Sequence, residues 1–292
     1  MGFLKLVQGM KPKKIMFILA ILPFIIFLIL LHSCMQFRLS DSKIQKEFEN
    51  LPIKPQIHYY EVLGKKMRYL DVGNPQNRLI LWVHGSPGSS SDFLKYLKDA
   101  DLLAKYRLVA VDRVGYGYSD FGNSETSLHI QAQLIAPLLD LNQHQKAPIL
   151  VGYSYGGAII GILAHQYPEK TAQMLMLACA LDPDNEQFFW VNKPADWRIF
   201  KGLVPAALRV ANDEKLAHVA QLRQIAGIWK ELKNPTTFVH GYKDNIVPIA
   251  NSQFALKEMS NAPTNSIFKK NLDHLLIWKE YTLIKELLMK MD

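Results

Sequence analysis

The sequence has few cysteines and no excess of glycine or proline. Its two cysteines, Cys34 and Cys179, lie in different settings, one at the end of an apolar N-terminal stretch and the other inside the apolar run 174–179. A disulfide framework is therefore not expected, and Cys179 is predicted to be a small, inert, buried side chain. With 16 glycines and 15 prolines in 292 residues, collagen-like and low-complexity classes are excluded.

An excess of one charge sign is also missing from most of the chain. The formal net charge is +8, but Lys5, Lys11, Lys13 and Lys14 precede the first acidic residue, so residues 35–292 carry 30 basic and 26 acidic side chains. No basic block contains interleaved aromatics, and nucleic acid is therefore not an expected partner. Hydrophobic residues make up 49% of the chain and charged residues 21%, which is typical of a globular protein with a sizeable core.

Charged side chains are absent from residues 15–31, an apolar run that reaches the roughly 17-residue lower bound for crossing a bilayer. The preceding lysines Lys11, Lys13 and Lys14 complete the pattern of a signal or anchor segment over residues 1–34. Because basic flanks stay on the cytoplasmic side, the rest of the chain is predicted to be extracytoplasmic and attached to the membrane through this segment.

The residues Leu31-His32-Ser33-Cys34 resemble a bacterial lipoprotein processing site, which implies cleavage before Cys34 and lipid attachment to it. His32 departs from that pattern, since the position is usually occupied by a small residue. An uncleaved signal anchor with an incidental cysteine is the alternative. Residues 35–57 are polar and mixed, and they are interpreted as a spacer without an assigned fold.

From residue 58 onward, short apolar runs alternate with helix-length segments. A hairpin is predicted around Gly64-Lys65, and continuous apolar runs follow that are typical of strands buried on both faces of a parallel sheet. Helices are expected over 128–141 and 156–167. This alternation predicts an α/β domain over 58–292 with a mostly parallel, doubly wound sheet. The predicted strands are 59–63, 67–72, 79–83, 108–111, 149–151, 174–179 and 236–240.

The alternation stops over about 182–234, after the sixth predicted strand. A structureless loop of that length is improbable in a compact domain. Because the segment is rich in helix formers and aromatic residues, a small helical lid is predicted. Its aromatic residues are Phe188, Phe189, Trp190, Trp197, Phe200 and Trp229.

The strand at 149–151 is followed by Gly152-Tyr153-Ser154-Tyr155-Gly156 and then by a predicted helix. A GxSxG motif needs this setting, because a sharp strand-to-helix turn exposes the serine hydroxyl and the glycines permit close backbone approach. Here the chain resembles the α/β-hydrolase superfamily, which implies that Ser154 is the nucleophile. An ordinary glycine-rich turn is the alternative interpretation.

Two further segments are similar to superfamily motifs. His84-Gly85-Ser86-Pro87-Gly88 looks like the HGxPG loop, and the resemblance implies that the backbone N–H groups of Ser86 and Tyr155 form the oxyanion hole. The segment 112–119 is similar to DRxGxGxS, which supports the fold. It is not a dinucleotide fingerprint, because position 120 is Asp instead of a third glycine.

A serine needs a base to accept its proton, and the superfamily's chain order of serine, acid and histidine implies His274, which follows the predicted last strand 266–270. Asp244, after the strand at 236–240, resembles the superfamily's acid. Asp182 or Asp184 is the alternative acid, since some members take it from the preceding strand. Asp273 is a plausible surface residue, and His84 is expected to be structural.

The sequence therefore predicts a serine hydrolase that cleaves an ester or lactone of a small, apolar or amphipathic molecule. No cofactor is expected, and no metal, since the histidines lack ligand spacing such as HExxH. Serine at position 154, instead of aspartate, argues against the epoxide hydrolase and dehalogenase branches. Hydrolysis of a carbon–carbon bond, aminopeptidase activity, and a non-catalytic binding protein on this fold are the alternatives.

Overall fold

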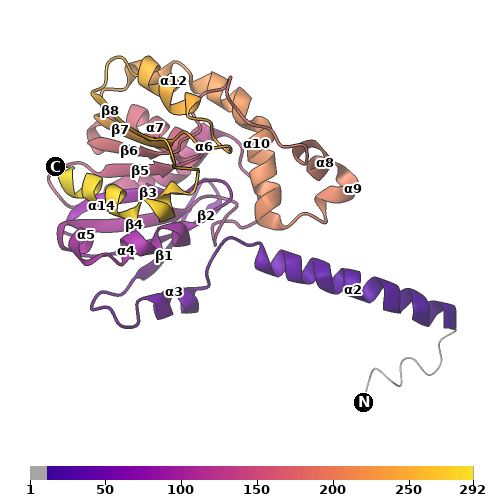
Figure 1. The fold of residues 1–292 in the computed structure, drawn as a ribbon. Helices are drawn as coiled ribbons and strands as arrows, with labels where there is room; N and C mark the ends of the chain where they lie inside the picture. The colour runs from indigo at the N-terminus through magenta and orange to yellow at the C-terminus, as the bar shows by residue number, and fades with distance from the viewer. Residues whose placement is uncertain (1–11, 292) are drawn as a thin grey trace.

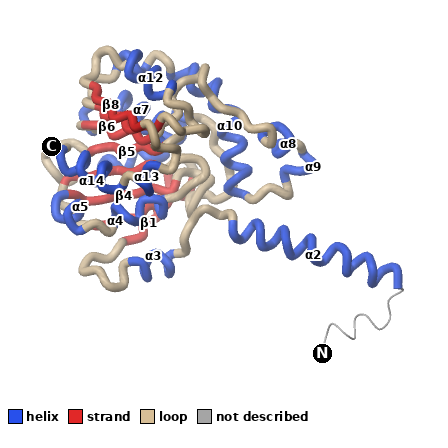
Figure 2. Tube along the Cα trace, viewed as in Figure 1, coloured by secondary structure: helices blue, strands red, loops and turns tan. Residues whose placement is uncertain are grey.

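The computed structural model describes residues 12–291, which form an eight-stranded sheet with helices on both faces (Figures 1 and 2). The strands are β1 (Gln56–Val62), β2 (Lys65–Val72), β3 (Arg78–Val83), β4 (Tyr106–Asp112), β5 (Ile149–Tyr153), β6 (Gln173–Leu177), β7 (Thr236–Gly241) and β8 (Thr264–Lys269). Their order is β1-β2-β4-β3-β5-β6-β7-β8, with β2 antiparallel to β1 and β4 and every other pair parallel. The predicted α/β architecture with a mostly parallel sheet is confirmed.

The central strand β3 divides its side chains between two apolar cores, one on each face of the sheet. Leu79, Leu81 and Val83 belong to one core, and Ile80 and Trp82 belong to the other. All five are fully buried. A strand covered on both faces must be apolar at every position, which explains why its sequence lacks the alternation of a half-exposed strand.

The helices cover the two faces in separate groups. Helices α6 (Leu128–Ile135), α7 (Gly156–Gln166) and α12 (Ala250–Glu258) contribute to the first core. The second core receives α4 (Leu94–Leu97), α5 (Ala100–Lys105), α13 (Leu276–Lys279) and α14 (Tyr281–Lys290). The described residues also form the short 3₁₀ helices η1 (Ser90–Phe93), η2 (Ala136–Leu141) and η3 (Pro168–Lys170). Helix η2 follows α6 directly, and the two together span the predicted helix 128–141.

A group of helices lies between β6 and β7, where the lid was predicted. The group extends beyond the edge of the sheet (Figure 1), and its aromatic and aliphatic side chains include some of the most exposed in the protein, such as Trp190 at 86% and Ile199 at 80%. Trp229, in contrast, is fully buried against the first core. The lid helices are α8 (Asn192–Asp196), α9 (Arg198–Lys201), α10 (Ala206–Ile225) and α11 (Ile228–Glu231).

The N-terminal apolar run forms part of helix α2 (Pro12–Cys34), which projects away from the sheet (Figure 1). Within residues 12–291, no helix is both long enough and apolar enough to cross a membrane, so the span predicted over 15–31 is not supported. Lys5 and Lys11 lie outside the described residues. Cys34 is exposed and unpaired. Its lipidation and the extracytoplasmic location of the domain stay predictions.

The predicted spacer 35–57, to which no fold was assigned, contains packed structure. Helix α3 (Asp41–Glu47) is capped by the side chain of Ser40, and Ile44 and Phe48 are fully buried in the second core. The guanidinium of Arg38 also lies 4.3 Å from the centre of the Tyr118 ring. The apolar side chains responsible are too few and too widely spaced for a clear periodic signal, so their burial depends on the tertiary structure.

Candidate active site

Ser154 lies at the sharp turn between β5 and α7, as the GxSxG motif predicts. Its φ angle is 53°, a left-handed conformation that side chains other than glycine rarely adopt. The flanking glycines are required by close packing, since a Cβ on Gly156 would lie 2.3 Å from the Val83 carbonyl oxygen and one on Gly152 would lie 2.9 Å from the Gly157 Cα. The turn is thus fixed by backbone contacts on both sides.

The structure brings the three residues predicted as a catalytic triad into one hydrogen-bonded chain. His274 Nε2 lies 3.0 Å from Ser154 Oγ, and His274 Nδ1 lies 2.7 Å from Asp244 Oδ2. Because a carboxylate only accepts hydrogen bonds, Nδ1 carries the proton, and Nε2 is left to accept the serine hydroxyl. The imidazole is therefore in the tautomer that a general base requires.

Asp244 is held in its ionised form by its neighbours. Burial opposes ionisation, but hydrogen bonds from His240 and His274 outweigh it and hold the pKa of Asp244 well below its usual range. The backbone N–H groups of Ile246 and Val247 also donate to its other oxygen, at 3.0 and 2.8 Å. An ionised Asp244 can both orient the His274 ring and stabilise an imidazolium.

His240 is a second histidine at this carboxylate, and the sequence analysis gave it no role. Its Nε2 lies 3.3 Å from Asp244 Oδ2 and 2.9 Å from the Val247 carbonyl, while its Nδ1 lies 2.7 Å from Ser252 Oγ. Both partners of Nε2 are acceptors, so Nε2 carries the proton and Nδ1 accepts from the serine. The i, i+4 spacing of His240 and Asp244 across the end of β7 was the available signal.

The loop 84–88 packs directly against the nucleophile. A Cβ on Gly85 would lie 2.9 Å from Ser154 Cβ, which shows how closely the loop backbone approaches. Ser86 and Tyr155, whose N–H groups are the predicted oxyanion donors, line the same pocket as Ser154. Tyr155 also precedes the first residue of α7, where N–H groups and the helix dipole favour negative charge.

The pocket over Ser154 has a volume of about 620 Å³ and is enclosed mainly by apolar side chains. Lid residues supply one wall and the loop after β7 supplies another; the apolar contributors include Phe189, Phe200, Leu203, Leu208, Ile246 and Val247. One end is polar, where Glu186 pairs with Lys215 and with His218 Nδ1 at 2.9 Å. Burial opposes ionisation of Glu186, but these two partners lower its pKa.

The other candidate residues lie away from this hydrogen-bonded chain. The two carboxylate oxygens of Asp182 accept from the Asp184 N–H and the Asn185 amide, and Asp184 forms an exposed ion pair with Arg223. Asp273 pairs with Lys279 at the surface. Cys179 is fully buried, and burial raises the pKa of its thiol above the usual range. Within residues 12–291, none of these side chains forms a hydrogen bond or an ion pair with the His274 ring.

Comparison with known proteins agrees with this architecture. The family model described as the alpha/beta hydrolase fold matches residues 78–204. The protein named Putative proline iminopeptidase from Mycoplasma pneumoniae is 28% identical over 250 residues, covering 74% of this chain and 76% of that protein. Epoxide hydrolase 1 from Caenorhabditis elegans is 27% identical, but the match spans only 47% of its length and 64% of this chain.

Among solved structures, 2-hydroxy-6-oxo-6-phenylhexa-2,4-dienoate hydrolase from Rhodococcus sp. strain RHA1 superposes with a TM-score of 0.63 at 17% identity. The match covers 82% of this chain and 98% of that one. At that identity the likeness concerns the fold alone. The family model and the sheet nevertheless agree on the fold, and this chain is a hydrolase of the α/β-hydrolase fold.

Proposed function

We propose that this protein hydrolyses carboxylic esters of small, largely apolar molecules, with Ser154 as nucleophile, His274 as general base and Asp244 as the residue that orients His274. The observation that carries the proposal is the position of His274, hydrogen-bonded to both Ser154 and Asp244 at the pocket. That arrangement activates a hydroxyl which is otherwise a weak nucleophile.

In the proposed mechanism Ser154 Oγ attacks the acyl carbonyl while its proton moves to His274 Nε2. The carbonyl oxygen becomes an oxyanion beside the N–H groups of Ser86 and Tyr155. The bond to the alcohol then breaks, and His274 returns the proton to the departing oxygen. Water, deprotonated by His274, attacks the acyl-serine in the same way and releases the acid. The bond between the acyl group and Ser154 Oγ breaks, His274 returns the proton to that oxygen, and the starting enzyme is restored without a cofactor.

The pocket lining supports an apolar acyl or alcohol group. Each buried methylene contributes about 0.8 kcal/mol when it leaves water for an apolar environment. The aromatic and aliphatic wall formed by Phe200, Leu203 and Leu208 offers that environment next to Ser154. We therefore expect kcat/KM for linear esters to rise with acyl chain length until the cavity of about 620 Å³ is filled.

The test combines a fluorophosphonate probe with p-nitrophenyl esters of two to twelve acyl carbons, applied to the full chain and to Ser154→Ala. We expect one labelled site, mapped to Ser154 by peptide mass spectrometry, and ester turnover that disappears in the variant. Ligand binding that is unaffected by Ser154→Ala, together with no labelling and no turnover in wild type, would instead identify a binding protein.

Aminopeptidase activity is a second candidate because of the relative from Mycoplasma pneumoniae and the presence of Glu186 in the pocket. A carboxylate in that position could pair with a substrate amine. Lys215 and His218 already occupy this carboxylate, which disfavours the activity. Proline p-nitroanilide distinguishes the candidates, and turnover of it above that of the best ester would favour the peptidase.

A further inference from the structure

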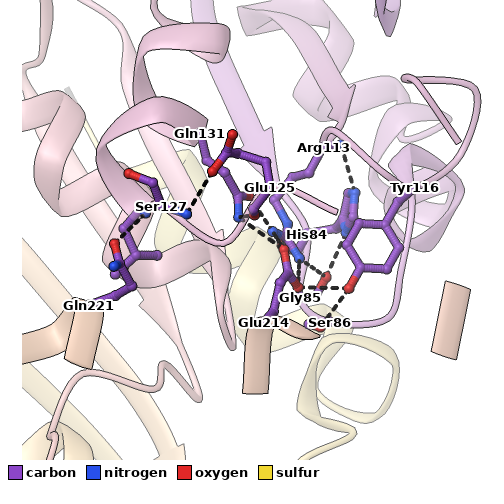
Figure 3. Close-up of polar contacts among 11 residues, drawn as sticks. His84, Gly85, Ser86, Arg113, Tyr116, Glu125, Ser127, Gln131, Glu214 and Gln221 are labelled. Carbon is purple, nitrogen blue, oxygen red and sulfur yellow. Dashed lines mark hydrogen bonds and ion pairs between the residues drawn. The ribbon is translucent and has the colours of Figure 1, made fainter. Parts of the chain in front are cut away.

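A carboxylate from the lid is buried against Arg113, a residue that contacts loop 84–88. This loop and the residues Ser154, Asp244 and His274 are called the floor of the active site. Glu214, on helix α10, is fully buried and forms a two-point ion pair with Arg113, with Oε1 2.6 Å from Nη1 and Oε2 3.1 Å from Nη2 (Figure 3). Gln131 also donates to Glu214, at 3.0 Å. Arg113 is itself fully buried. Because an unpaired buried charge is strongly destabilising, each of these two residues depends on the other.

Arg113 in turn holds the loop that approaches the nucleophile. Its Nε donates to the His84 carbonyl at 3.1 Å, and its Nη2 donates to the Gly85 carbonyl at 3.0 Å. Burial and the nearby charge of Arg113 hold the pKa of His84 well below its usual value, so that ring is neutral. His84 Nε2 accepts from the Arg113 backbone N–H at 2.9 Å, which leaves Nδ1–H to donate to the Gly85 carbonyl at 2.7 Å.

The Gly85 carbonyl thus accepts two hydrogen bonds, and this determines the direction of the next N–H group. The carbonyl of residue 85 and the N–H of Ser86 belong to one planar, trans peptide unit, in which they point in opposite directions. Anchoring the carbonyl on Arg113 therefore fixes the orientation of the Ser86 N–H. That N–H is one of the two proposed oxyanion donors.

The same carboxylate reaches Ser86 by a second route. Tyr116 donates to Glu214 Oε2 at 2.7 Å, and its hydroxyl lies 2.8 Å from Ser86 Oγ (Figure 3). Burial and the charge of Glu214 raise the pKa of Tyr116 well above its usual value, so the phenol keeps its proton. Since that single proton is directed to Glu214, the Ser86 hydroxyl must donate to Tyr116. Ser86 is thereby held by both its peptide group and its side chain.

We infer that Glu214 is a positioning residue for the oxyanion hole, through which the lid fixes the Ser86 N–H. This inference rests on the proposed ester hydrolysis and adds a link between lid and floor. The guanidinium of Arg113 also lies 4.6 Å from the centre of the Tyr155 ring, so one cation contacts both the Gly85 carbonyl before Ser86 and the residue that supplies the other proposed donor. When α10 moves away from the floor, Arg113 loses its counter-charge and both donors lose their support.

The test compares Glu214→Gln and Tyr116→Phe with wild type in the full-length protein. Glu214→Gln keeps the shape but removes the charge. Tyr116→Phe removes the hydrogen bonds of the Tyr116 hydroxyl to Glu214 and Ser86 and leaves the ion pair of Glu214 with Arg113 in place. We expect kcat per active site, counted by fluorophosphonate titration, to fall by about thirtyfold and about tenfold, with KM within about twofold. Loss of a whole oxyanion donor costs about 10² to 10³ in kcat, and a misplaced donor should cost less.

A trifluoromethyl ketone supplies a readout that a purely structural role would not change. It forms a tetrahedral adduct with the serine, so its inhibition constant should rise in proportion to the loss of kcat in each variant. The matched control is Gln221→Leu, which removes another contact of α10 without touching loop 84–88 (Figure 3). In that contact Gln221 Oε1 accepts from the Leu128 N–H at 3.2 Å. This control should retain wild-type kcat per site.

The outcomes separate the inference from the proposed function. Wild-type protein without labelling or ester turnover would contradict the proposed function itself. If wild type is active, the inference is overturned by variants that keep kcat per titrated site, that raise only KM, or that merely lower the titrated fraction. If Glu214→Gln does not fold, kcat per titrated site of Tyr116→Phe tests the inference, because the Tyr116→Phe substitution removes no buried charge.

Discussion

The floor and the lid of the active site differ in secondary structure and in the side chains that they provide. The floor takes Ser154, Asp244 and His274 from the ends of strands β5, β7 and β8, which are hydrogen-bonded into one sheet. The lid is built from short helices and exposes large apolar side chains such as Trp190. Groups that must keep sub-ångström geometry thus lie on the sheet, whereas the lid supplies the apolar pocket wall.

Glu214 is an exception to this division between floor and lid. It belongs to lid helix α10, but its carboxylate pairs with Arg113, which contacts loop 84–88. A lid that only covered the pocket would need no buried charge, and burying one is costly unless its partner is fixed. We therefore propose that the lid helps to position the oxyanion donors in addition to selecting the substrate. The following predictions test how separate the two regions are.

The largest effect is expected for Ser154→Ala on the floor. Removing the nucleophile should lower kcat by about 10⁴-fold or more, since only binding and the oxyanion hole remain. The fold should persist, because the substitution removes a single hydroxyl from a small buried side chain. Stopped assays for activity and circular dichroism for structure check both parts, and residual kcat within tenfold of wild type would contradict the assignment.

The second prediction concerns the acid. Asp244→Asn should lower kcat by about 10³ to 10⁴-fold, because an amide no longer selects the His274 tautomer that accepts the serine proton. Asp182→Asn is the matched control and should stay within about twofold of wild type, since the Asp182 carboxylate accepts from Asp184 and Asn185 instead of from His274. The opposite pattern would transfer the role of the acid to Asp182.

The lid itself offers a matched pair of tryptophans. Trp229 is fully buried, and a Cβ on Gly161 of α7 would lie 2.5 Å from its ring, so the two surfaces are in tight contact. Trp229→Ala should lower the free energy of unfolding by about 3–5 kcal/mol, and Trp190→Ala should change it by less than about 0.5 kcal/mol. Urea unfolding measures both, and equal losses would show that the exposed lid surface is packed in solution.

The smallest effect is the pH dependence of stability from Asp244. Its pKa is lower in the folded than in the unfolded protein, so the folded form binds the proton less readily. The stabilisation is present above the unfolded pKa of about 3.9 and is lost as pH falls toward the lower folded pKa, by roughly 1–3 kcal/mol. The stability difference between wild type and Asp244→Asn should therefore shrink from pH 6 to pH 3. A constant difference would show that the carboxylate is not stabilised by His240 and His274.

The sequence was sufficient to predict that Ser154, Asp244 and His274 lie together, because each follows an apolar strand in a segment that resembles a superfamily motif. Ser154, Asp244 and His274 each follow such a run, and parallel strands bring their carboxyl ends to one edge. The contact of Glu214 with Arg113 could not be predicted in this way, since 101 positions separate the two residues and no local pattern marks Glu214 as buried. The same reason applies to Ile44 and Phe48, whose burial depends on the domain they pack against.

The left-handed backbone of Ser154 has an evolutionary consequence. For a residue with a Cβ, this conformation costs of order 1–3 kcal/mol, a penalty that glycine would largely avoid. Selection for a stable fold alone would thus favour glycine at this turn. A serine here has a cost in stability that the fold itself does not require.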